Sequence, residues 1–189
     1  MIVSFNFYYA RPGQEDAVLR QRLRACDVRA TIGVPRGRVL ARTAGAADLP
    51  DVIWEHHFDD VAGHHADMAV RAASPEFEAV RAGMRKLCRR FERPLFEICA
   101  DAGPTSVAAS GSVILDWFFC APDAQELARL TQHESGGGRL LRLLTPGTDL
   151  PGFIWQSDGI EAPRSASVTR TVAAGATAQR LEHSVWKVM

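Results

Sequence analysis

The sequence predicts an α+β protein built from two copies of one β-α-β-β-α-β unit, the second copy with reduced helices. Short segments rich in aromatic and β-branched residues recur in the same order in both halves of the chain. In the first half they alternate with stretches whose apolar residues follow helical spacing. A cluster of Gly, Pro, Ser and Thr separates the halves, which places repeat 1 at residues 1–100, a linker at 101–111 and repeat 2 at 112–189.

Matching segments define the repeat and indicate where the two copies differ. Residues 7–12, Phe-Tyr-Tyr-Ala-Arg-Pro, match the segment Trp-Phe-Phe-Cys-Ala-Pro 110 positions later. Residues 37–40 and 48–54 match segments 101 positions later, and residues 92–98 match a segment 90 positions later. Because the matched segments have the composition of strands, the falling offset predicts shorter helical connections in repeat 2. We expect only a short helix or a structured loop in the region 158–179.

The first elements of repeat 1 follow from local patterns. A strand at residues 2–9 ends at the turn signal Arg11-Pro12-Gly13. A helix is expected at residues 14–26, followed by strands at residues 36–43 and 51–58. The buried stripe of this helix is expected to contain Val18, Leu19, Leu23 and Cys26.

Two helical segments and a last strand complete repeat 1. Asp59 or Asp60 is the expected N-cap of the first segment, and Ser74 caps the second, with Pro75 at the first helical position. Residues 95–99 are expected to form the last strand. We expect the basic residues between 81 and 93 to form a solvated helix face. The second helix is expected to reach Phe91, because helical spacing relates Phe77, Val80, Met84, Leu87, Cys88 and Phe91.

Composition excludes several classes of protein. The 189 residues include 22 basic and 22 acidic side chains and 47% apolar residues, enough for a folded core. Zero net charge argues against electrostatic recruitment by nucleic acid or a membrane, and no apolar run has the length of a membrane span. Four widely spaced cysteines without a C-x-x-C pair and a first segment unlike a secretory signal lead us to expect a cytoplasmic protein.

A histidine-rich stretch, residues 55–67, is the most conspicuous candidate for chemistry. We expect His57 and His65 to be its acid, base or ligand candidates, with His65 on an inward helical stripe. The spacing matches no established metal-ligand pattern, and His56 and His57 are neighbours in a strand and so point to opposite faces. The alternative is that these histidines cap, pack or face solvent. The stripe expected to share the inward face contains Val61, Met68, Ala69 and Ala72.

Repeat 1 resembles antibiotic-biosynthesis-monooxygenase-like (ABM) domains of the dimeric α/β-barrel superfamily. The resemblance lies in residues 11–15, Arg-Pro-Gly-Gln-Glu, in Trp54 on the third strand and in residues 74–77, Ser-Pro-Glu-Phe. It implies tandem ferredoxin-like units that pair their antiparallel sheets into one fused α/β barrel. Members of this superfamily differ widely in activity, so the resemblance is more specific for fold than for function.

The resemblance also implies a type of site. Haem-degrading members have an asparagine on the first strand, matched by Asn6, and a tryptophan and a histidine that are replaced here by Arg71 and Arg81, which argues against haem degradation. Quinol-type monooxygenases of the family need no cofactor, only a mostly apolar cavity with a few polar groups. We accordingly expect no cofactor and no metal. The expected catalytic residues are His57, His65 and Asn6, and the expected substrate-binding residues are Tyr8, Trp54 and Arg71.

The functional prediction is a small-molecule-binding protein or a monooxygenase-like oxidoreductase that acts on an aromatic or quinol-type substrate in repeat 1. One alternative is a non-catalytic stress-related or assembly barrel. A second alternative is a metal-binding protein that uses the cluster from His56 to His65. We expect no nucleic-acid or membrane partner, and either a monomer or a homodimer.

Overall fold

The computed structural model describes residues 1–101, 111–123, 138–145, 149–158 and 180–189. The chain forms two compact units. Unit 1 comprises residues 1–41, 47–95 and 189, and unit 2 comprises residues 42–46 and 96–188. The predicted linker and the region 159–179 of repeat 2 lie almost entirely outside the described residues.

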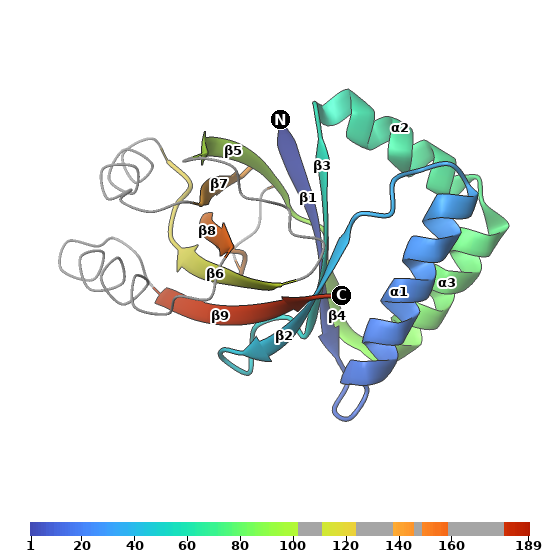
Figure 1. The fold of residues 1–189 in the computed structure, drawn as a ribbon, viewed down its shortest axis with the longest axis horizontal. Helices are drawn as coiled ribbons and strands as arrows, with labels where there is room; N and C mark the ends of the chain where they lie inside the picture. Colours follow the sequence, from blue (N-terminus) through green and yellow to red (C-terminus); the bar gives the residue numbers. More distant parts are fainter. Residues whose placement is uncertain (102–110, 124–137, 146–148, 159–179) are drawn as a thin grey trace. The chain divides into compact units, whose positions relative to one another are not determined.

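Unit 1 is a four-stranded antiparallel sheet with three helices on one face (Figure 1). The strands stand in the order β2, β3, β1, β4, so the first strand of the chain is central. Both faces of β1 are covered, since all nine of its residues are buried. The elements are β1 (Ile2–Ala10), α1 (Glu15–Thr31), β2 (Arg38–Ala44), β3 (Val52–Phe58), α2 (Val61–Ala72), α3 (Pro75–Leu87) and β4 (Cys88–Glu92).

The core of unit 1 fills the space between the sheet and its helices. Val18 and Cys26 of α1 and Met84 of α3 pack against Tyr8 and Trp54 of the sheet. Directly paired residues of neighbouring strands share a face, so the pair of Asn6 with Trp54 and that of Tyr8 with Val52 mark the face toward the helices. The intervening residues of β1 point to the other face.

Unit 2 consists of antiparallel strands in its described part. Four of its strands are β6 (Ser112–Phe119), β7 (Arg139–Leu143), β8 (Phe153–Asp158) and β9 (Arg180–Val188). The fifth, β5 (Leu95–Asp101), belongs to unit 2 from Phe96 onward and pairs with β7. The order β9, β6, β8, β7, β5 places β6 between two neighbours, as β1 lies between two neighbours in unit 1.

Strand registers in the two units agree with the sequence offsets. Phe7 pairs with Ile53 in unit 1, and Trp117 pairs with Ile154 in unit 2, which are the positions 110 and 101 residues later. Phe7 also pairs with Glu92, as Trp117 does with Glu182, 90 positions after Glu92. These matched positions therefore have the same place in each sheet. Residues 95–98 of the last match differ, because they lie in β5 and pair with β7, whereas residues 185–188 lie in β9, which pairs with β6.

In each unit, a glycine lies directly against the indole ring of a tryptophan. Gly37 has φ of +72°, and a Cβ there would collide with the Trp54 indole. Gly138, 101 positions later, has φ of +156°, and a Cβ there would lie 2.8 Å from Trp155 Nε1. Glycine is needed at both positions because its missing Cβ leaves room for the ring and its backbone tolerates positive φ.

The structure confirms an α+β fold, consistent with an α/β barrel, and both predicted caps. Asp60 accepts a hydrogen bond from the Gly63 amide, and Ser74 accepts one from the Phe77 amide. The prediction that the last helix reaches Phe91 is wrong. It ends at Leu87, and residues 88–92 form β4 instead, because pairing with β1 satisfies their backbone and brings the Phe91 ring within 5.0 Å of the Tyr8 ring.

Two further observations concern the environment of the chain. All four cysteines are free thiols. Among the described residues, none of the helices has the length and apolar character that crossing a bilayer requires.

Candidate functional site

Unit 1 contains a cavity of about 100 Å³ between the sheet and its three helices, which we call the unit 1 cavity. Its walls are mostly apolar on the side of α3 and β4, and its polar groups come from β1 and from arginines. Phe91 and Arg93 are exposed and form part of its rim. The lining residues are Asn6, Tyr8, Arg22, Ala25, Arg71, Phe77, Val80, Arg81, Met84, Arg85, Cys88, Phe91 and Arg93.

The hydroxyl of Tyr8 is a polar group of the cavity whose position is set by two hydrogen bonds. Asn6 Nδ2 donates a hydrogen bond to it at 3.2 Å, and an Arg22 terminal nitrogen donates another at 3.1 Å. Two donors occupy the lone pairs of the oxygen, so its own hydrogen is the group left to donate. No described residue accepts that hydrogen, which makes Tyr8 a hydrogen-bond donor available to a ligand.

Five arginines line the cavity and no carboxylate does. Arg81 and Arg85 share Glu78 on the surface of α3, and Arg71 pairs with Asp67 at 2.7 Å. The remaining two, Arg22 and Arg93, form no ion pair with any described residue.

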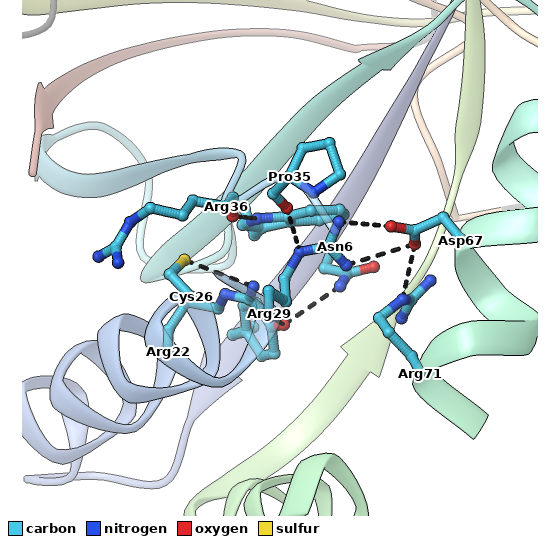
Figure 2. Close-up of polar contacts among 10 residues, drawn as sticks. Asn6, Arg22, Cys26, Arg29, Pro35, Arg36, Asp67 and Arg71 are labelled. Carbon is cyan, nitrogen blue, oxygen red and sulfur yellow. Dashed lines mark hydrogen bonds and ion pairs between the residues drawn. The ribbon is translucent and has the colours of Figure 1, made fainter. Parts of the chain in front are cut away.

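Trp54 packs against two arginine side chains of α1, one of which lines the cavity. Its indole lies between two guanidinium groups, 4.9 Å from that of Arg22 and 4.5 Å from that of Arg29, and its Nε1 donates to the Arg36 carbonyl. Figure 2 shows Arg29 of α1 directed toward Asp67 of α2. Trp54 is fully buried and does not line the cavity.

The buried carboxylates of unit 1 remain ionised. Burial raises the pKa of Asp67, but hydrogen bonds from Arg29 and the charge of Arg71 more than offset it and hold that pKa below its usual value. Burial likewise opposes ionisation of Glu55, and the nearby Arg38 and His57 lower its pKa to about 2.

One histidine on the helix face of the sheet is neutral at pH 7. Burial, together with the charge of Arg29, lowers the pKa of His56 to about 4. The His56 ring lies 5.9 Å from the Trp54 ring and 4.6 Å from the Phe58 ring.

Three of the six predicted site residues meet in the cavity, namely Asn6, Tyr8 and Arg71. Trp54 lies beneath them. His57 lies on the other face of the sheet, paired in register with Val3 and bonded to Glu55 at 2.7 Å. Its predicted catalytic role stays a prediction.

The predicted inward orientation of His65 is wrong, because His65, Val61, Met68, Ala69 and Ala72 are all exposed. The helix α2 turns Asp67 inward instead, where its carboxylate meets the buried Arg29. His56 and His57 point to opposite faces, as predicted. In the part of the chain that the structure describes, no three His, Cys, Asp or Glu side chains come close enough to hold a metal ion.

Four further cavity residues were not predicted from the sequence, namely Arg22, Arg81, Arg85 and Arg93. Arg85 and Arg93 are exposed, as the prediction of a solvated face requires, but both also line the cavity together with the half-buried Arg81. Helical spacing could have predicted that Arg22 is buried, because it lies on the same face of α1 as the buried Val18, Ala25 and Cys26.

No family model matches the chain, and no curated protein matches it significantly. Solved structures do match it. An anthrone oxidase-like protein is 15% identical, with a TM-score of 0.61, over 100% of this chain and 90% of the other. A candidate monooxygenase from Fusobacterium nucleatum is 10% identical, with a TM-score of 0.53, over 99% and 91%. A candidate monooxygenase from Lactobacillus acidophilus is 9% identical, with a TM-score of 0.51, over 100% and 92%. The chain therefore shares the ABM-like fold of these proteins, in agreement with the resemblance found in its sequence.

Proposed function

We propose that the unit 1 cavity binds a small aromatic or quinol-like molecule and that the protein oxidises it with molecular oxygen, without a cofactor. The observation that carries the proposal is the Tyr8 hydroxyl, which two donors hold inside a mostly apolar cavity so that its hydrogen is left for a ligand. The fold shared with an anthrone oxidase-like protein and with candidate monooxygenases supports it.

Such a substrate supplies all the electrons that the reaction needs. An anthrone reacts with one O₂ to give an anthraquinone and one water: the ring CH₂ becomes a carbonyl, and its two hydrogens leave in the water. A hydroquinone gives a hydroxyquinone and water with the same balance. The electron-rich species that reacts with oxygen is the deprotonated enol or phenol, so a donor held at that oxygen stabilises the developing negative charge.

Each residue of the cavity has a separate role in the proposed oxidation. Tyr8 donates to the substrate oxygen, and Asn6 keeps the Tyr8 hydroxyl oriented. Arg71 adds a polar group on the side of α2, with its guanidinium held by Asp67. Phe77 and Met84 are buried and present apolar surface to an aromatic ring.

The test measures oxygen uptake with anthrone and with a one-ring hydroquinone, and the incorporation of one isotopically labelled oxygen atom into the product. We expect Tyr8→Phe to lower kcat by roughly tenfold or more, because it removes one donor to the developing oxyanion. Tyr9→Phe is the matched control: Tyr9 is the next residue of β1, and its hydroxyl donates to Glu92 outside the cavity. Equal rates for wild type and Y8F, or no oxygen uptake above the uncatalysed rate, would contradict the proposal.

The same assay separates the cavity from the histidines. If catalysis takes place in the cavity, His57→Ala and His65→Ala leave turnover unchanged, since one side chain lies on the far face of the sheet and the other is exposed. Loss of turnover in either variant would instead support the predicted histidine site.

We further infer that unit 2 is a second copy of the same unit and that the two copies close one fused barrel. The equal registers and the two glycine–tryptophan contacts support a common origin. Light scattering of the purified chain tests closure: a strict monomer supports it, whereas a dimer would show that the fused barrel still self-associates.

A further inference from the structure

A buried arginine without an acidic partner lies at the unit 1 cavity. Arg22 is 3% exposed, and among the described residues its nitrogens donate hydrogen bonds only to the Tyr8 hydroxyl and the Cys26 sulfur, while its guanidinium lies 4.9 Å from the Trp54 ring centroid. Its Nε has no hydrogen-bond partner among the described residues. An arginine remains charged in proteins, so Arg22 is a buried cation that is held by the Tyr8 hydroxyl and the Cys26 sulfur and has no carboxylate beside it.

The charge of Arg22 is part of a wider positive field. Arg93 lines the same cavity, its guanidinium packed 4.7 Å from the Phe91 ring centroid, and it likewise forms no ion pair within the described chain. Burial lowers the pKa of Arg93, and the neighbouring Arg81, Arg71 and Arg85 lower it further. The cavity thus concentrates positive charge although the chain as a whole is neutral.

We propose that the ligand of the unit 1 cavity carries an anionic oxygen group, which Arg22 and Arg93 neutralise. The group is a carboxylate or a deprotonated phenol or enol, since all three present a charged oxygen to a guanidinium. Arg22 meets this oxygen at the same point as Tyr8, whose hydroxyl it already holds. The proposal deepens the proposed function by naming the charge of the substrate, and it rests on the same cavity.

Only a small part of an aromatic ligand fits inside the cavity. A cavity of about 100 Å³ is smaller than the roughly 150 Å³ engineered cavity that holds benzene, so a single ring fills it and the remainder extends past the exposed Phe91 and Arg93. Benzoate is therefore a suitable probe, and benzamide has the same shape without the charge.

The experiment compares the binding of benzoate, benzamide and inorganic sulfate by calorimetry. We expect benzoate to bind at least about tenfold more tightly than benzamide, the effect of one charge-assisted hydrogen bond. Arg22→Met and Arg93→Gln should each remove that preference. Arg24→Gln is the matched control, because Arg24 is an exposed arginine of α1 that does not line the cavity. Since Arg93 is exposed, R93Q keeps the test valid if R22M misfolds.

The outcomes separate this inference from the proposed function. Equal affinity for benzoate and benzamide overturns the anionic ligand and leaves an aromatic site. Binding of sulfate alone supports the anion site and contradicts the aromatic function, whereas no binding of any probe contradicts both. A preference for benzoate that survives in both R22M and R93Q also overturns the proposal.

A second experiment distinguishes a carboxylate ligand from a phenolate ligand. Bound 4-nitrophenol should ionise at lower pH than the free phenol, which its nitrophenolate absorbance reports, if the cavity accepts a phenolate. A lowered pKa that R22M restores supports the phenolate form. Tight benzoate binding without that shift supports a carboxylate ligand.

Discussion

Arg29 of α1 and Asp67 of α2 form a two-pronged ion pair in which both side chains are almost fully buried. The Nη2 atom of Arg29 lies 2.6 Å from Oδ1 of Asp67 and its Nη1 lies 3.3 Å from Oδ2, while its Nε donates to the Pro35 carbonyl. Arg71 reaches the same carboxylate, so one acid joins two helices and orients a cavity residue (Figure 2). The chemistry of the cavity therefore depends on a contact outside it.

Asp67→Ala should destabilise the protein strongly. It leaves Arg29 buried without a counter-ion, for which we expect a loss of about 3–5 kcal/mol in the free energy of unfolding. Urea denaturation at pH 7 measures it. Asp27→Ala is the control, because Asp27 is 65% exposed and its pair with Arg36 should contribute less than about 1 kcal/mol. Similar losses in both variants would mean that burial of the pair has no effect on its strength.

Arg22→Met should stabilise the ligand-free protein, in contrast to Asp67→Ala. The substitution removes a buried cation that has no carboxylate partner and keeps an unbranched apolar stem, so we expect the ligand-free protein to gain about 1 kcal/mol in stability. The same variant loses the preference for anionic ligands. Thermal and urea unfolding of R22M, compared with Arg24→Met at an exposed position of α1, measure the gain. A marked loss of stability would mean that the bonds from Arg22 to Tyr8 and Cys26 outweigh its desolvation.

Much of the fold could be predicted because strand patterns are local. Most of the matched segments lie in strands of the two units, and their offsets agree with the pairing of Phe7 with Ile53 and of Trp117 with Ile154. The end of α3 could not be predicted in this way. Residues 88–92 continue the helical spacing of α3, and only the edge of β1, distant in sequence, makes them a strand.

The site was predictable only in part, for a related reason. Asn6, Tyr8 and Arg71 followed from the family resemblance, and they meet in the cavity. Periodicity assumes that apolar residues face inward, and α2 does the reverse, exposing Met68 and burying Asp67 because a buried arginine of α1 faces it. Such pairing depends on tertiary contacts that sequence spacing does not contain.

Gly37→Ala should reveal the glycine–tryptophan contact. A Cβ would enter the Trp54 indole and lie 2.8 Å from the Glu55 carbonyl, and φ of +72° adds strain, so we expect a loss of about 2–4 kcal/mol. Gly33→Ala is the matched control: φ is +76°, but nothing lies within 4 Å, so only the backbone strain of roughly 1 kcal/mol remains. Chemical denaturation of both variants isolates the steric part. Equal losses would show that Trp54 moves aside at no cost.

The pH dependence of stability should report on His56. Its pKa is about 4 in the folded protein and near 6.5 in the unfolded chain, so below pH 6.5 the unfolded chain takes up a proton that the folded protein refuses. Stability is fully present above pH 6.5 and falls as the pH drops toward 4, by about 2 kcal/mol between pH 7 and pH 5. His56→Asn should reduce that loss by the same amount, whereas His65→Asn, at an exposed position, should follow the wild-type curve. Urea denaturation at the two pH values measures the difference. If H56N and wild type lose equal stability, His56 is protonated in the folded protein at pH 5 and its contact with the buried Arg29 network is weaker than the structure indicates.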